Sequence, residues 1–339
     1  MKLLLTGGTG YIGSHTAVAL SQAGHEVVLL DNLSNSKASV LDRLQVILGR
    51  ALAFEEADVR DTDQVIRCLQ THQVQAVIHF AGLKAVGESV AQPLDYFANN
   101  VQGTVSLLQA MQQVNIKNLV FSSSATVYGA PHYLPLDEQH PTAATNPYGR
   151  TKLHIEEMLQ DVAASDPVWR VACLRYFNPV GAHESGLIGE DPTGVPNNLM
   201  PYVAQVAAGW RPSLQVFGND YDTPDGTGVR DYIHVMDLAQ GHLAALQHLP
   251  QQTGWQAYNL GTGQGYSVLD MVKAFEQASG QQVPCQIVGR RAGDVASCYA
   301  QVNKAHQVLS WQATRGLQQM CIDAWRWQQQ TVRPHEKTV

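Results

Sequence analysis

The stretch LLLTGGTGYIG, residues 3–13, decides the fold of this chain of 339 residues. Its apolar run predicts a short buried strand, and glycines at positions 7, 10 and 13 predict a tight turn into a helix over residues 12–23. Glycine lets a pyrophosphate approach the backbone amides, and the helix N-terminus adds partial positive charge. Because a strand precedes the motif and a helix follows it, we interpret it as a dinucleotide-binding turn, with a plain tight turn as the alternative.

An acidic residue follows the second predicted strand, which covers residues 26–30. Asp31 lies 18 residues after Gly13, where a carboxylate can accept hydrogen bonds from adenosine ribose hydroxyls and would repel a 2′-phosphate. No arginine occurs between Asp31 and Asp42, although Lys37 is near, so the sequence favours NAD over NADP. The alternative is an exposed carboxylate at a strand end. Asp58 is a second candidate, for contact with the adenine, and an acidic loop is its alternative.

Further apolar runs predict a parallel sheet. Residues 76–80, 118–121 and 168–174 read as buried strands, with a helix over residues 99–113 between the first two. Buried strands that alternate with helices are typical of a doubly wound, Rossmann-type α/β fold. Beyond about residue 180, glycine, proline and asparagine become frequent, which predicts a smaller C-terminal α/β domain. We expect the chain to return to the first domain around residues 231–249.

The composition excludes several classes of protein. Lys plus Arg is 22 and Asp plus Glu is 29, a net charge of −7, whereas a nucleic-acid binder needs a basic surface. The five cysteines are widely spaced and include no Cys-x-x-Cys pair, so we expect no metal site, no disulfide framework and a reducing compartment. No apolar run reaches the roughly 18 residues of a membrane span, and the N-terminal run is too short for a signal peptide. We therefore expect a soluble cytoplasmic protein without membrane or nucleic-acid partners.

A possible acid–base group lies near the middle of the chain. Tyr148 and Lys152 are four residues apart and share one face of a predicted helix. A nearby ammonium favours the phenolate, so we expect the pKa of Tyr148 to fall below its ordinary value of about 10. Such a tyrosine can act as general base on a substrate hydroxyl. Upstream, Ser124 closes a strand and could hold the same hydroxyl.

These motifs together resemble the extended short-chain dehydrogenase/reductase superfamily. Four further stretches narrow the resemblance to the UDP-galactose 4-epimerases, from residue 1 to about 330: HFAGLKAVGES at 79–89, SSSATVYG at 122–129, LRYFNPVGA at 174–182 and GVRDYIHV at 228–235. The resemblance implies a cytoplasmic, homodimeric, NAD-dependent isomerase of galactose metabolism, which interconverts UDP-galactose and UDP-glucose through a 4-keto sugar. It also implies an NAD-binding domain over residues 1–180 and a UDP-sugar-binding domain over 181–339.

The resemblance also implies roles for individual residues. Tyr148 would take the proton of the sugar 4-hydroxyl, Lys152 would bind the nicotinamide ribose, and Ser124 would bridge the 4-oxygen. Besides these three, the implied cofactor contacts are Gly7, Gly10, Tyr11, Ile12, Gly13, Asp31, Asn32, Asn35, Ser36, Asp58, Val59, Phe80, Ala81, Gly82, Lys84, Asn99 and Phe177. Besides Ser124 and Tyr148, the implied substrate contacts are Asn178, Asn198, Leu199, Gln215, Val216, Phe217, Arg230, Tyr232, Arg291, Asp294 and Cys298.

Three of these substrate residues carry specific expectations. Arg230 and Arg291 would clamp the diphosphate, because guanidinium groups bind such oxygens in pairs. Cys298 stands where some members of the family carry a bulky tyrosine, so the pocket beside the sugar C2 would be wide. We therefore predict that UDP-N-acetylglucosamine and UDP-N-acetylgalactosamine are also accepted. The alternative is that Cys298 is only a small packing residue.

Other activities fit the sequence less well. A nucleotide-sugar 4,6-dehydratase needs an acidic pair beside the strand-end hydroxyl, where this chain has Ala125 and Thr126. A non-catalytic NAD-binding member of the fold usually lacks the tyrosine or the lysine, and both are present. A simple dehydrogenase with exchangeable NAD is the third alternative, and turnover without added NAD would separate it from an epimerase.

Overall fold

A parallel sheet of seven strands organises the larger region of the molecule. The structure is a computed structural model and describes residues 1–192, 194–291 and 293–331. The strand order is β10-β6-β5-β4-β1-β2-β3, and every neighbouring pair is parallel. The strands are β1 (Lys2–Thr6), β2 (Glu26–Asp31), β3 (Ala53–Glu56), β4 (Ala76–His79), β5 (Asn118–Ser124), β6 (Arg170–Tyr176) and β10 (Gly254–Leu260).

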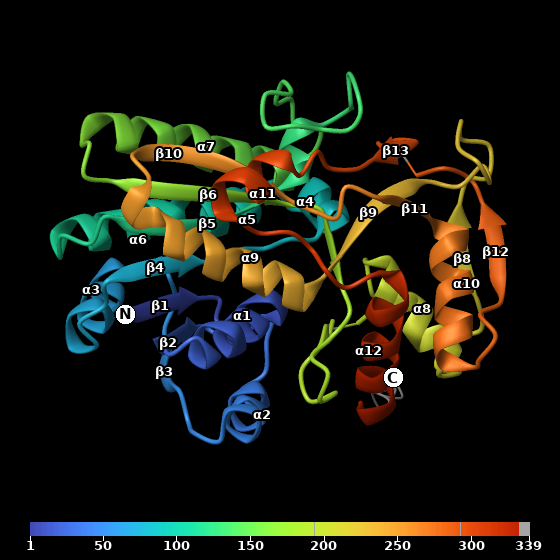
Figure 1. Ribbon diagram of the computed structural model, residues 1–339, viewed down its shortest axis with the longest axis horizontal. Helices are drawn as coiled ribbons and strands as arrows, with labels where there is room; N and C mark the ends of the chain where they lie inside the picture. Colours follow the sequence, from blue (N-terminus) through green and yellow to red (C-terminus); the bar gives the residue numbers. More distant parts are fainter. Residues whose placement is uncertain (193, 292, 332–339) are drawn as a thin grey trace.

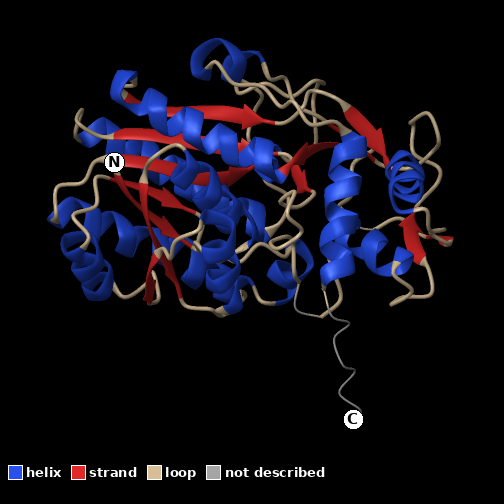
Figure 2. Ribbon diagram, turned by 60° about the horizontal axis from the view of Figure 1, so that its bottom comes forward, coloured by secondary structure: helices blue, strands red, loops and turns tan. Residues whose placement is uncertain are grey.

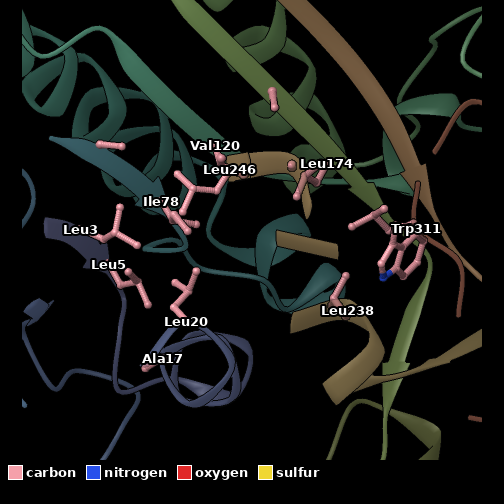
Figure 3. Close-up of a cluster of buried hydrophobic side chains, with 14 of the residues drawn as sticks. Leu3, Leu5, Ala17, Leu20, Ile78, Val120, Leu174, Leu238, Leu246 and Trp311 are labelled. Carbon is pink, nitrogen blue, oxygen red and sulfur yellow. The ribbon is translucent and has the colours of Figure 1, made fainter. Parts of the chain in front are cut away.

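Helices cover both faces of this sheet, which explains why its inner strands are mostly apolar, whereas the edge strand β3 has no buried residue. Successive side chains of β1 point to opposite faces: Leu3 and Leu5 join one buried cluster, and Leu4 joins the other. The first cluster, shown in Figure 3, packs against α1 (Tyr11–Gln22), α2 (Ser39–Leu48) and α9 (Val235–His248). The second packs against α3 (Thr62–Thr71), α6 (Gly103–Gln113) and α7 (Pro147–Ser165). Figure 2 shows the strands between the two layers of helices.

A smaller α/β region lies at one end of the molecule (Figure 1). A four-stranded sheet joins β7 (Asn178–Val180), β9 (Val229–His234), β11 (Gly265–Ser267) and β13 (Ser297–Cys298), and a two-stranded sheet joins β8 (Leu214–Phe217) and β12 (Cys285–Val288). Their main core packs against α8 (Leu199–Ala207), α10 (Val268–Ser279) and α12 (Leu317–Gln330). The short helices are α4 (Val86–Ala91), α5 (Pro93–Tyr96), η1 (Phe97–Gln102), η2 (Ala125–Tyr128), η3 (Leu249–Gln251) and α11 (Asn303–Leu309).

The Rossmann-type fold with a smaller α/β region confirms the predicted class. The chain crosses back to the first sheet within the segment expected to return, because α9 packs on α1 and β10 then becomes an edge strand beside β6. The assignment of residues 1–180 and 181–339 to separate binding domains stays a prediction, and residues 332–339 of it lie outside the described residues. No helix in the described part of the chain is both long enough and apolar enough to cross a membrane.

Two predicted elements differ from the structure. The helix expected over residues 99–113 begins as a π-helical segment, η1, before α6 continues it. The strand expected over residues 168–174 lies two residues later, at β6, because Trp169 still belongs to the turn that precedes it. The first difference lies in the segment that carries Asn99, a predicted cofactor residue.

Candidate active site

The glycine turn after β1 lies against the segment that follows β4. Gly7 has φ +67°, and a Cβ there would lie 2.7 Å from the backbone nitrogen of Ala81, so only glycine fits. A Cβ at Gly13 would collide with the carbonyl of Gly7. Gly10 caps α1 without a side-chain hydrogen bond from any described residue, which leaves amides of the first turn for a ligand. The turn therefore has the shape and the polarity that a pyrophosphate requires.

Asp31 joins this turn to the loop after β2. It is buried, and its Oδ2 accepts a hydrogen bond from the backbone nitrogen of Thr9 at 3.1 Å. Its Oδ1 accepts from the backbone nitrogen of Leu33 at 3.0 Å and from Ser36 Oγ at 3.2 Å. The alternative of an exposed strand-end carboxylate is therefore wrong. Thr9, which the sequence analysis did not single out, makes two hydrogen bonds here. Its backbone nitrogen donates to Asp31, and its Oγ1 bonds Ser36 Oγ at 2.8 Å.

Asp58, the predicted adenine contact, is held by an arginine that the sequence analysis missed. Arg60 Nε donates to Asp58 Oδ1 at 2.9 Å, and Asn32 Nδ2 donates to Asp58 Oδ2 at 3.0 Å. Hydrogen bonds from Arg60 hold the pKa of the Asp58 carboxyl well below its usual range. The Val59 side chain lies in the core beneath the sheet, so only its backbone is available to a ligand.

The predicted cofactor residues gather at one edge of the sheet. A dinucleotide binds at this edge, outside the carboxyl ends of the strands, in folds of this kind. The residues follow successive strands: Gly7, Gly10, Tyr11, Ile12 and Gly13 after β1; Asp31, Asn32, Asn35 and Ser36 at the end of β2; Asp58 and Val59 after β3; Phe80, Ala81, Gly82 and Lys84 after β4; Ser124 at the end of β5; and Phe177 after β6.

The predicted catalytic residues lie between β5 and α7. The Oγ of Ser124 accepts hydrogen bonds from the backbone nitrogen of Thr126 at 3.2 Å and from its Oγ1 at 3.0 Å. Tyr148 lies in the first turn of α7, which Asn146 caps. Lys152 is buried one turn later, and its Nζ donates to the carbonyl of Ser122 at 2.6 Å. A Cβ added to Gly82 would lie 3.8 Å from that Nζ, so the lysine borders the predicted cofactor segment.

The predicted lowering of the Tyr148 pKa by Lys152 is wrong for this structure. Burial raises the pKa of Tyr148, and a hydrogen bond with Ser124 opposes the rise only in part. Burial also lowers the pKa of Lys152 to about 8. The spacing of four residues placed both groups on one helix face, but it could not show how burial by other segments would shift each pKa.

The π-helical segment η1 positions Asn99 and a residue that the sequence analysis missed, Asn100. Asn100 is buried, and its Oδ1 accepts from the backbone nitrogen of Leu83 at 2.8 Å. Its Nδ2 donates to Thr151 Oγ1 at 3.0 Å, and Thr151 lies between Tyr148 and Lys152 on α7. One amide therefore connects the loop after β4 to the helix of the catalytic pair.

Lys84 and Asn198, one predicted for the cofactor and one for the substrate, meet at Glu190. The Oε1 of Glu190 accepts from Lys84 Nζ at 2.8 Å and from Asn198 Nδ2 at 2.7 Å. The Lys84 ammonium also lies 5.8 Å from the ring centroid of Tyr11, whose hydroxyl donates to the carbonyl of Gly181 at 2.7 Å. The sequence analysis missed Glu190, because contact across 106 residues leaves no local signal.

The predicted substrate residues lie in the smaller region. The Arg291 guanidinium is 4.6 Å from the ring centroid of Phe217, and its Nε bonds Asp294 Oδ2 at 3.0 Å. Burial raises the pKa of Tyr232 to about 12, and the charges of Arg230 and Arg291 oppose this rise. Asn178 lies opposite Tyr232 in the sheet.

Other predicted substrate residues differ in how much of the side chain is accessible. Gln215 is exposed, whereas Val216 is buried in the core and offers a ligand only its backbone. Leu199 packs partly against the same core, at the start of α8. Cys298 lies opposite Arg230 on β13 and packs against a buried cluster of Val127, Tyr128, Leu136, Phe177 and Ala300.

A parallel Rossmann sheet with this glycine turn, and with Ser124, Tyr148 and Lys152 at one strand end, defines a dinucleotide-dependent enzyme of the short-chain dehydrogenase/reductase type. The chain belongs to the NAD dependent epimerase/dehydratase family, whose model matches residues 3–261. It is 58% identical over 336 residues to the UDP-glucose 4-epimerase of Bacillus subtilis (strain 168), and the match covers 99% of both chains.

Solved structures are similar over nearly the whole length. The UDP-glucose 4-epimerase of Stenotrophomonas maltophila with bound NAD and formylated UDP-arabinopyranose is 54% identical, with a TM-score of 0.96 over 97% of this chain and 98% of that one. The enzyme of Bifidobacterium longum in complex with NAD⁺ and UDP is 51% identical, with a TM-score of 0.94 over 97% and 98% of the two chains.

Proposed function

We propose that this chain is a UDP-glucose 4-epimerase, an isomerase that interconverts UDP-galactose and UDP-glucose with NAD as its cofactor. The observation that carries the proposal is the convergence of Ser124, Tyr148 and Lys152 beside the glycine turn, in a chain that is similar over its full length to enzymes of that name. The residues at the sheet edge fit NAD. They offer free helix amides and a close backbone approach at Gly7, and a carboxylate at the end of β2.

The chain's own residues perform the acid–base part of the reaction. Tyr148 takes the proton from the sugar 4-hydroxyl and returns it after the sugar has turned, so no proton is lost overall. Ser124 holds the 4-oxygen and, through its hydrogen bond with Tyr148, favours the phenolate form during the transfer, while Lys152 binds the nicotinamide ribose. When bound, NAD supplies the acceptor and donor for the hydride of the sugar C4. Arg230 and Arg291 hold the diphosphate while the sugar presents its other face.

The main alternatives lack support at the site. Elimination of water by a 4,6-dehydratase needs a carboxylate beside Ser124, where Ala125 and Thr126 lie in η2 and Thr126 donates to the serine. A non-catalytic role is not favoured, because the tyrosine and the lysine both lie at the strand end.

Assembly, location and domain roles are further parts of the proposal. We propose a homodimer formed through helices of the first domain, since Val90 on α4 and Leu94 on α5 are apolar and 64% and 81% exposed. All five cysteines are free, which supports a reducing, cytoplasmic location. We also propose that residues 1–180 bind NAD and residues 181–339 bind the UDP-sugar.

Turnover of UDP-galactose by the purified protein tests the main proposal. We expect conversion to UDP-glucose without added NAD, and Tyr148→Phe should lower kcat by about 10²–10⁴-fold, the usual contribution of a general acid–base group. Tyr133→Phe, at an exposed tyrosine away from the site, is the matched control and should keep the wild-type rate. Absence of turnover in the wild type would refute the activity, and an unchanged rate for Tyr148→Phe would refute the assigned base.

A further inference from the structure

A buried chain of hydrogen bonds encloses the residues on both sides of Ser124. Tyr148, Lys152 and Glu156 follow one another at intervals of four on α7 and so share a face. Lys152 Nζ donates to the carbonyl of Ser122, and Glu156 Oε1 accepts from the hydroxyl of Ser123. The helix that carries the candidate base is therefore bonded to the two consecutive residues that precede Ser124.

Arg175 completes the chain from the neighbouring strand. It lies opposite Ser123 in the register of β5 and β6, and its Nη2 donates to Glu156 Oε2 at 2.6 Å. Its Nη1 donates to Tyr128 Oη at 3.1 Å, and Tyr128 ends the η2 turn that starts directly after Ser124. One guanidinium thus bonds Glu156, which accepts from Ser123, and Tyr128, which follows Ser124.

These groups have almost no access to water. Glu156 is 1% exposed, Arg175 is 4% exposed and Ser123 is 1% exposed. A buried ion pair is weak support for stability, because desolvation offsets much of the attraction, but its fixed geometry can specify one arrangement of the surrounding groups. Here the arrangement that it specifies is the distance between α7 and the end of β5.

We propose that Ser123, Glu156 and Arg175 form a positioning unit that holds Ser124 in register with Tyr148 and Lys152 and keeps a negative charge near the lysine. None of the three is placed in contact with substrate or cofactor. The inference rests on the proposed function for its kinetic consequences, and its geometric and electrostatic parts stand on the contacts described above.

The electrostatic part follows from the groups around Lys152. These are Glu156 and Tyr148 on its own helix, Cys173 on β6 and His79 on β4. Burial lowers the pKa of Lys152 to about 8, and Cys173 and then Glu156 oppose that fall. Replacing Glu156 by glutamine removes one of the two opposing groups, so the lysine should lose its proton at a lower pH than in the wild type.

Ser123→Ala is the most direct test, because it breaks the link to the strand and leaves the ion pair intact. A displacement of about 1 Å at a reacting group costs up to about 10²-fold, and we expect kcat for UDP-galactose to fall about ten-fold with KM within two-fold of the wild type. Ser165→Ala, at the exposed end of α7, is the matched control and should leave kcat unchanged. A kcat for Ser123→Ala within two-fold of the wild type would overturn the positioning role.

A titration separates this inference from the proposed function. The pKa of Lys152 can be followed by ¹⁵N NMR of lysine-labelled full-length protein and assigned with Lys152→Arg, whether or not the chain turns over UDP-galactose. We expect Glu156→Gln to titrate at lower pH than the wild type and Glu156→Asp to restore the wild-type value. The alkaline limb of the kcat profile should shift in the same direction. Identical titrations in all three proteins would overturn the electrostatic role, and Ser123→Ala decides the positioning role if Glu156→Gln does not fold.

Discussion

At this site the space around a residue can determine its identity as much as the ligand that it would bind. Gly7 is required because a side chain there would collide with the backbone after β4, and the sequence predicted this position from its glycine spacing between a strand and a helix. The pKa of Tyr148 could not be predicted in the same way. A spacing of four residues shows which groups share a helix face, whereas burial, which here raises the pKa, depends on segments far away in the chain.

Cys298 carries the residue-scale prediction about substrate range. Its place beside Arg230 and against Phe177 supports a small side chain bordering the sugar site, and we propose turnover of both N-acetylated UDP-sugars. Cys298→Tyr should abolish that turnover by filling the pocket, while UDP-galactose conversion stays within a few-fold of the wild type. Coupled assays with the four UDP-sugars measure this. The absence of wild-type activity on either N-acetyl substrate would show that Cys298 is only a packing residue.

At the scale of elements, five of the seven strands of the first sheet were predictable, whereas β3, β10 and the smaller region were not. Leu3, Leu4 and Leu5 are all buried because both faces of the sheet are covered, so a short apolar run marks each of these five strands, whereas the edge strand β3 has no buried residue. In the smaller region β13 has two residues and β7 has three, too few to produce a pattern. The π-helical turn of η1 also left no signal, since it depends on the contacts that Asn100 makes with Leu83 and Thr151.

The η1 segment gives the element-scale prediction. Asn100→Ala leaves the backbone nitrogen of Leu83 without its buried acceptor, and an unsatisfied buried group costs about 1–3 kcal/mol. We therefore expect a lower free energy of unfolding, measured in urea, and weaker retention of NAD on gel filtration. Gln113→Ala, on the exposed end of α6, is the control and should change neither quantity by a measurable amount. Equal stability of the two variants would contradict the role given to Asn100.

At the scale of the whole molecule, buried neutral histidines make stability depend on pH. Burial lowers the pKa of His15 to about 3, that of His79 to about 3 and that of His242 to about 4. In the unfolded chain each titrates near 6.5, so protons bind the unfolded state first as the pH falls. Stability is therefore complete above about pH 6.5 and decreases below it, until the folded-state pKa values are reached.

This loss should be steep, because three groups act together. One proton taken up by the unfolded state changes stability by about 1.4 kcal/mol per pH unit, so the three histidines contribute about 4 kcal/mol per unit between roughly pH 6 and 4. Urea unfolding across that range measures the slope. His79→Gln should reduce it by about one third, whereas His306→Gln, at an exposed position on α11, should leave it unchanged. A flat profile from pH 6.5 to 4 would contradict this account.

Asp31 has a consequence for the kinetics of cofactor exchange. Its two oxygens already accept three hydrogen bonds from Thr9, Leu33 and Ser36, so the glycine turn and the loop after β2 are fixed to each other within the folded chain. A dinucleotide that enters this edge does not have to order those segments, and less of its binding free energy is lost as conformational entropy. Such preorganisation slows dissociation, which suits an enzyme whose cofactor is restored to its starting state in every catalytic cycle.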